Sequence, residues 1–227
     1  MSEWVQQLLP NASKIPSEII EATRQTLYMV FWTSLIAGVL GILLGVVLVV
    51  SRKDGILENR FIYQCLDKVI NIVRSIPFII LLSLLALFTR FIVGTTIGEK
   101  AALVPLVIGV IPFFARQIEI ALLEVNPGVI EAAQAMGTHP LGIIFRVYLV
   151  EGLAGIVRVS ALTIINVIGL TTMAGAVGAG GIGNLAISRG YNRFQTDITV
   201  VATLIILVLV FISQFISNLI IKKIKHT

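Results

Sequence analysis

The residue types that carry out enzymatic chemistry are scarce in this sequence. Its single cysteine, Cys65, and its two histidines, His139 and His226, cannot form an internal disulfide or a histidine-rich metal site. Ser188 and the other serines have no evident histidine and carboxylate partners for a nucleophilic triad. The chain has no Gly-x-x-x-x-Gly-Lys-Ser/Thr segment, so it is not expected to hydrolyse ATP by itself. The sequence predicts no enzyme, metal site or cofactor of its own.

One glycine-rich segment has the spacing of a nucleotide site. Gly178 to Gly183 reads G-x-G-x-x-G, but a dinucleotide site needs this pattern after a strand and at the start of a helix. Here the pattern ends a long apolar stretch. Close backbone packing or a flexible bend is the favoured interpretation. Gly41 and Gly45 form a G-x-x-x-G pair, for which close helix packing is again expected.

Polar groups inside apolar stretches are the candidates for a transport pathway. Asn166, Thr172 and neighbouring threonines either bond adjacent helices or line a path at a dimer axis, and Met173 is expected to form a soft apolar gate. Arg74 either reaches the inner interface or faces a wet cavity. Each carboxylate near a span lies at one of its ends, which argues against a proton- or sodium-driven transporter: Glu99, Glu119, Glu124 and Asp197.

A sharper signal lies between residues 126 and 140. Asn126 can cap a helix that starts at Pro127, and Gly137 can take the left-handed conformation that ends it. Thr138 or His139 can then cap a second helix near Pro140. The segment predicts a helix, a glycine turn and a second helix. Such a knob suits insertion into a cleft of another protein, although a simple linker fits the capping pattern equally well.

The amino-acid composition indicates the kind of protein in which these residues lie. The chain has 227 residues, of which 57% are hydrophobic and 13% charged, and its mean hydropathy is +0.99. Soluble domains carry about 25% charged residues. The net charge of +5 comes from lysines and arginines dispersed between apolar stretches, so membrane topology explains it better than nucleic-acid binding. The sequence therefore predicts an all-α polytopic membrane protein.

Apolar stretches predict five transmembrane helices, because about 20 apolar residues cross a bilayer. The predicted spans are 25–51, 69–93, 101–123, 159–188 and 198–221. Basic residues favour an outer N-terminus and an inner C-terminus. We expect an extracytoplasmic segment at 1–24, with an amphipathic helix over residues 1–22 that includes Trp4. A transmembrane domain should follow at 25–221, with a cytoplasmic loop at about 124–158 and a basic tail at 222–227.

The loop motif resembles that of a known family. Glu131, Ala132 and Ala133, followed after three residues by Gly137, are similar to the EAA motif of ATP-binding-cassette importer permeases. In the family's continuation, I-x-L-P, Leu149 matches and Val150 replaces the proline. The similarity is closest to permeases of bacterial methionine importers, and three stretches carry it: 74–82, 88–98 and 173–183.

The resemblance implies a type I ABC importer fold with five helices, N-out and C-in, in the bacterial plasma membrane. It implies a homodimer in membrane lipid, two cytoplasmic ATPase subunits that hold ATP and Mg, and an extracytoplasmic substrate-binding lipoprotein. Glu131, Ala132, Ala133, Gly137 and Leu149 would couple to the ATPase, and methionine would be the substrate. Two alternatives stay open: a permease for another small solute, and a stand-alone secondary transporter. An intramembrane enzyme is the least favoured class.

Overall fold

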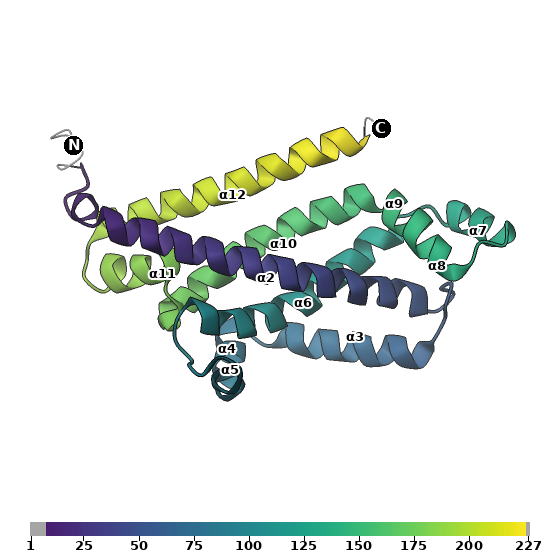
Figure 1. Ribbon diagram of the computed structural model, residues 1–227, viewed down its shortest axis with the longest axis horizontal. Coiled ribbons are helices and arrows are strands. Elements are labelled where there is room, and N and C mark those ends of the chain that lie inside the picture. Colours follow the sequence, from purple (N-terminus) through teal and green to yellow (C-terminus); the bar gives the residue numbers. More distant parts are fainter. Residues whose placement is uncertain (1–7, 226–227) are drawn as a thin grey trace. The chain divides into compact units, whose positions relative to one another are not determined.

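The computed structural model describes residues 8–225, and every regular element in this range is a helix (Figure 1). Five short or distorted elements accompany the main helices: η1 (Ala12–Lys14), η2 (Ile144–Tyr148), α9 (Leu149–Glu151), η3 (Gly175–Ala179) and η4 (Ala186–Tyr191). The others are α2 (Pro16–Ser51), α3 (Arg60–Ser75), α4 (Phe78–Leu84), α5 (Ala86–Val93), α6 (Glu99–Leu123), α7 (Pro127–Ala135), α8 (Pro140–Ile143), α10 (Leu153–Ala174), α11 (Gly181–Leu185) and α12 (Thr196–Lys225).

Four helical stretches are long and apolar enough to cross a membrane: Pro16–Ser51, Glu99–Leu123, Leu153–Ala179 and Thr196–Ile224. They coincide with the first, third, fourth and fifth predicted spans. The all-helical class is therefore confirmed over the described residues.

The second predicted span, 69–93, is not one helix. The helix α3 ends at Ser75, and α4 begins only at Phe78. Between them, Ile76 and Pro77 are extended, with ψ of 122° and 136°. Proline has no backbone N–H to donate, and it disfavours helical geometry in the residue before it. Proline can kink a helix, and at Pro77 the structure shows a complete break.

Two other predicted boundaries also need correction. The amphipathic helix expected over 1–22 is wrong where it can be judged, because residues 16–22 form the first turns of α2. Pro16 suits the first helical position, and no glycine or proline interrupts the chain before Gly38; Trp4 lies outside the described residues. The fourth span ends well before Ser188, at a glycine bend. The helix α12 continues through Lys225, so the described part of the predicted basic tail is helical.

The chain divides into two compact units, and α2, α6, α10 and α12 each contribute to both. Unit 1 contains the residues up to Leu35, Pro77–Ile108 and Ile164–Ser213. Two clusters form its core, one around Met29 and Leu106 and one around Ile182 and Ile198.

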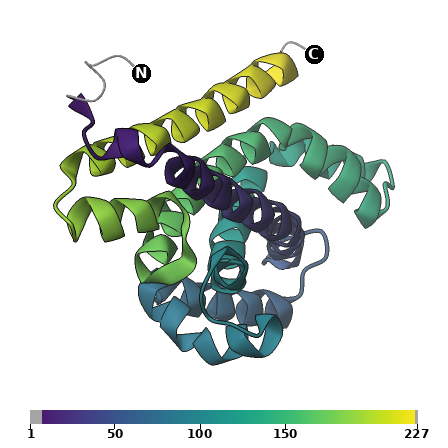
Figure 2. The ribbon, with the colours of Figure 1, turned by 60° about the vertical axis from the view of Figure 1, so that its left-hand side comes forward.

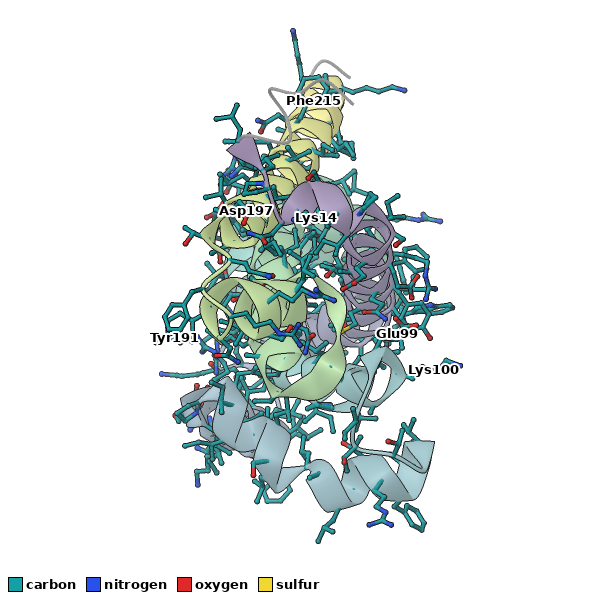
Figure 3. All side chains as sticks on the ribbon, turned by 90° about the vertical axis from the view of Figure 1, so that its left-hand side faces the viewer. Lys14, Glu99, Lys100, Tyr191, Asp197 and Phe215 are labelled. Carbon is teal, nitrogen blue, oxygen red and sulfur yellow. The ribbon has the colours of Figure 1, made fainter. Side chains whose placement is uncertain are left out.

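A carboxylate ties the start of the described chain into unit 1. Asp197, labelled in Figure 3, accepts hydrogen bonds from the backbone N–H groups of Asn11 and Ala12 and from the Asn11 amide, at 2.7, 2.9 and 2.9 Å. These bonds hold η1 against the first turn of α12.

Unit 2 contains Ile36–Ile76, Gly109–Thr163 and the residues from Gln214 onward. Its larger core cluster joins α2, α6, the α7–α8 segment and the start of α10, through residues such as Val49, Ile118, Ala133 and Ile156. A smaller cluster packs Leu48 and Ala115 against Ile70 of α3.

Candidate functional site

The α7–α8 hairpin belongs to unit 2 (Figure 1), and both of its helices begin at caps that the sequence predicts. Asn126 accepts a hydrogen bond from the Gly128 N–H at 2.9 Å, and Pro127 takes the first helical position. His139 Nδ1 accepts from the Leu141 N–H at 3.3 Å at the start of α8. Both caps satisfy amide groups that a helix start leaves without partners.

The turn between the two helices depends on Gly137. Its φ is +73°, a left-handed value that glycine adopts without a Cβ penalty. Its N–H donates to Gln134 O at 2.9 Å, and the Thr138 N–H donates to Ala133 O at 3.0 Å. This pair of bonds is the Schellman arrangement, which closes a helix C-terminus. The predicted helix, glycine turn and helix are therefore confirmed.

The motif residues divide between core and surface. Ala133 is buried against Ile143 and Tyr148, and Leu149 is half-buried against the same cluster. Glu131 and Ala132 are exposed. The buried alanine fixes α7 to unit 2, and it leaves the carboxylate facing outward.

Large apolar side chains of the same segment are exposed as well. Val129, Met136, Leu141 and Phe145 are all exposed, and Met136 is 78% exposed. A group of exposed apolar residues next to a defined turn is typical of a docking surface. We call these four residues, with Glu131 and Ala132, the hairpin surface.

Tyr148 packs against the hairpin in the core of unit 2. Burial raises the pKa of its phenol, and the nearby Arg52 guanidinium opposes this by a smaller amount. The side chain is therefore neutral near pH 7 and serves as a packing residue.

The predicted pathway residues come from both units. Asn166 and Met173 share a face of α10, seven residues apart, in unit 1. Thr172 donates to its own helix, to Ile168 O at 3.1 Å. Arg74 belongs to unit 2 and is exposed in the last turn of α3. Met173 is also exposed, at 48%.

The G-x-G-x-x-G segment is a tight bend in unit 1 (yellow-green in Figure 2). Gly178, Gly180 and Gly181 have φ of +101°, +81° and +77°. Added Cβ atoms on Gly175 and Gly183 would meet backbone atoms at 2.6 and 2.3 Å, so only glycine permits the chain to fold back this closely.

Two side chains of α2 accept hydrogen bonds from backbone N–H groups of this bend. Gln25 accepts from the Gly181 N–H at 2.7 Å, and Thr26 accepts from the Ile182 N–H at 2.9 Å. The amides that would have to hold a phosphate are therefore already bonded. A bend, the favoured sequence interpretation, is confirmed. Sequence reasoning did not identify Gln25 or Thr26, because they lie about 156 residues away from their partners.

Sequence reasoning also missed a polar network between α3 and α6. Arg116 donates to Glu119 at 2.6 Å and pairs with Asp67, and the Tyr63 hydroxyl donates to Glu119 at 3.2 Å. The Glu119 side chain is only 4% exposed. The i, i+3 spacing of Arg116 and Glu119 was the available signal.

Comparison with known proteins places this geometry in a family. The family model described as "Binding-protein-dependent transport system inner membrane component" matches residues 37–226. The chain is 45% identical over 208 residues to the probable D-methionine transport system permease protein MetI of Vibrio cholerae, covering 92% of each chain. It is 47% identical over 204 residues to the methionine import system permease protein MetP of Bacillus subtilis, covering 90% of this chain and 92% of that one.

Solved structures of ABC transporters have a similar fold. A chain of the MetNI methionine ABC transporter in an inward-facing conformation superimposes with a TM-score of 0.89 at 39% identity, over 99% of both chains. A chain of an amino acid ABC transporter shares the fold, with a TM-score of 0.78 at 18% identity over 95% of this chain and 98% of that one. This chain therefore belongs to the family of binding-protein-dependent transport system inner membrane components.

Proposed function

We propose that this chain is the permease subunit of an ATP-driven importer that carries methionine across the bacterial inner membrane. The hairpin surface is the observation that carries the proposal, because a capped, partly apolar knob needs a partner to cover it. Two relatives named for methionine transport are similar over nine-tenths of this chain. They are the basis for proposing methionine as the substrate.

The proposed assembly is a homodimer with two ATPase subunits on the hairpin side and a substrate-binding lipoprotein outside. ATP and Mg bind to the ATPase subunits, so this chain needs no cofactor. In the proposed topology α3, α4 and α5 together make the second of five crossings, with the N-terminus outside and the C-terminus inside.

ATP binding closes the ATPase subunits, and the hairpins move with them. Glu131, Ala132 and Gly137 receive this movement, and Ala133 and Leu149 transmit it because they pack into the unit 2 core. The spans then alternate between states open to either side, and Met173 gates the path.

The test compares two glycines in the same conformation. Gly137 and Gly94 both have positive φ, 73° and 82°, and both donate from the backbone N–H. Proline can adopt neither conformation and has no N–H. Gly137→Pro should lose ATP-dependent methionine uptake and release the ATPase during copurification, whereas Gly94→Pro should retain the ATPase.

Charge reversal provides a second comparison. Glu131→Lys should uncouple ATP hydrolysis from uptake, whereas Glu124→Lys, at an exposed position just before the hairpin, should not. Normal ATP-dependent uptake in both Gly137→Pro and Glu131→Lys would refute the coupling role. Uptake by the chain alone in liposomes would favour a secondary transporter, and competition by unlabelled amino acids would reveal a different solute.

A further inference from the structure

Unit 1 contains a cavity of about 190 Å³ that is partly open to its surroundings. Its walls come from the end of α4, from α5, from the loop before α6, from the first turns of α6 and from the bend after α10. Leu82, Ala86, Thr89, Ala102, Pro105 and Val177 are representative of the lining. Figure 3 marks the start of α6 by its labels at Glu99 and Lys100.

The lining is mostly apolar, and its two side-chain hydroxyls belong to Thr89 and Thr96. Thr96 is exposed, whereas Thr89 is buried. Thr89 is 3% exposed, and its buried hydroxyl has no hydrogen-bond partner among the described residues. Several other threonines donate to a carbonyl of their own helix, as Thr163 does to Val159 O at 2.8 Å. Thr33 also has a buried hydroxyl without a partner among the described residues, but it does not line this cavity. A buried hydroxyl without a partner is unfavourable and needs an explanation. A ligand atom that accepts a hydrogen bond would supply one.

The chemistry of the lining selects the ligand. No charged residue lines the cavity, so the ammonium and carboxylate groups of an amino acid would not be bound there. A cavity of about 150 Å³ accommodates benzene, so this one has room for the four heavy atoms of an unbranched side chain. A thioether sulfur is apolar and accepts weakly from a hydroxyl. These properties together match the side chain of methionine.

The cavity also lies next to the bend that ends α10. The Gly98 N–H donates to Gly178 O at 3.0 Å, which fastens the loop before α6 to this bend. Val177, a wall residue, is four residues beyond Met173 and departs from helical geometry, with φ of −111° and ψ of 22°. A change in the bend would therefore change the cavity.

We propose that this cavity binds the side chain of the transported amino acid during translocation, with the Thr89 hydroxyl donating to the thioether sulfur. The proposal rests on the proposed import of methionine. It adds a selectivity site within the permease itself, in addition to any selection by the binding protein.

The test uses the complete complex in liposomes and measures ATP-driven uptake of methionine, norleucine and 2-aminobutyrate in competition. Ala86→Leu fills the cavity and should shift preference from methionine toward the shorter 2-aminobutyrate by about tenfold, a typical value for a crowded apolar pocket. Thr89→Val removes the donor and should abolish the preference for methionine over norleucine, which has a methylene in place of sulfur. Thr89→Ser should keep it. Ala176→Leu adds the same atoms at an exposed position and is the matched control.

Photolabelling tests the unmodified protein, so it does not depend on the folding of a variant. A methionine analogue with a diazirine in its side chain should label peptides from α5 and the start of α6, and excess methionine should prevent this. Unchanged selectivity in Ala86→Leu and Thr89→Val, or labelling confined to other segments, would overturn the cavity proposal while the wild-type complex imports methionine. A wild-type complex that does not import methionine would overturn the proposed function and the cavity proposal together.

Discussion

At the scale of single residues, two glycines determine how closely α2 and α6 pack in unit 2. A Cβ on Gly41 would lie 2.6 Å from Phe114 Cδ1, and one on Gly45 would lie 2.6 Å from Ile118 Cβ. Real Cβ atoms do not approach other atoms so closely. The G-x-x-x-G spacing predicted close packing, and the structure supplies the partner helix.

Gly45→Val should therefore destabilise the protein. Overpacking of a close contact typically costs about 1–3 kcal/mol, and here the obstacle includes the Ala115 backbone oxygen at 2.8 Å. Gly38→Val is the control, because nothing lies within 4 Å of a Cβ at that position of the same helix. Thermal unfolding of the purified protein in detergent gives the comparison, and equal midpoints for the two variants would contradict the prediction.

Met173→Ala should raise substrate leak or ATP hydrolysis without uptake, since it shortens an exposed apolar side chain at the proposed gate. Leu162→Ala removes a similar apolar volume from α10 at a similar exposure, 54% against 48%, and should leave both quantities unchanged. Efflux from preloaded liposomes and ATPase activity of the complex measure the effect. Unchanged leak and coupling in Met173→Ala would exclude the gate.

At the scale of elements, the contact of α3 with α6 depends on charge. One guanidinium, Arg116, is shared by the carboxylates of Asp67 and Glu119. Its removal leaves a buried carboxylate uncompensated, and breaking such a pair costs about 3–5 kcal/mol.

Arg116→Met should lower the unfolding midpoint strongly. Arg60→Met breaks an ion pair whose arginine is 68% exposed, and should change the midpoint little, because exposed pairs contribute about 0–1 kcal/mol. Adding Glu119→Gln and Asp67→Asn to Arg116→Met should recover part of the loss, since it removes the unpaired charges. A triple variant less stable than Arg116→Met would argue that packing, and not charge, is responsible.

Local patterns predicted some elements well and others poorly. The hairpin was predictable because Asn126, Pro127, Gly137 and Pro140 act on their own neighbours. The spans around α6 and α12 were predictable from apolar length. Pro77 indicates a kink in the second span, but the local pattern does not show that α3 and α4 separate completely. The bonds from Gln25 and Thr26 to the glycine bend, and the fit of Glu119 between helices, depend on long-range packing that no local pattern encodes.

At the scale of the whole molecule, the number of crossings determines which side each end of the chain faces. Four helical stretches satisfy the length and hydropathy of a span. With four crossings the two ends would share one side, and with five they lie on opposite sides. The segment from α3 to α5 decides between these arrangements, because it is broken at Pro77 and a crossing there would have to be a composite of short helices.

Single cysteines on either side of this segment should report its crossing. In a background with Cys65→Ser, an impermeant maleimide added to intact cells should label Thr95→Cys after α5 and Arg193→Cys before α12. It should reach Lys53→Cys before α3, and His139→Cys in the hairpin turn, only after the cells are opened. All four positions are described, and all four are exposed. Labelling of Thr95→Cys and Lys53→Cys from the same side would mean that α3 to α5 does not cross. The four remaining crossings would place the N-terminus, the hairpin and the C-terminus all on the same side. That result would contradict the proposed N-out, five-helix topology.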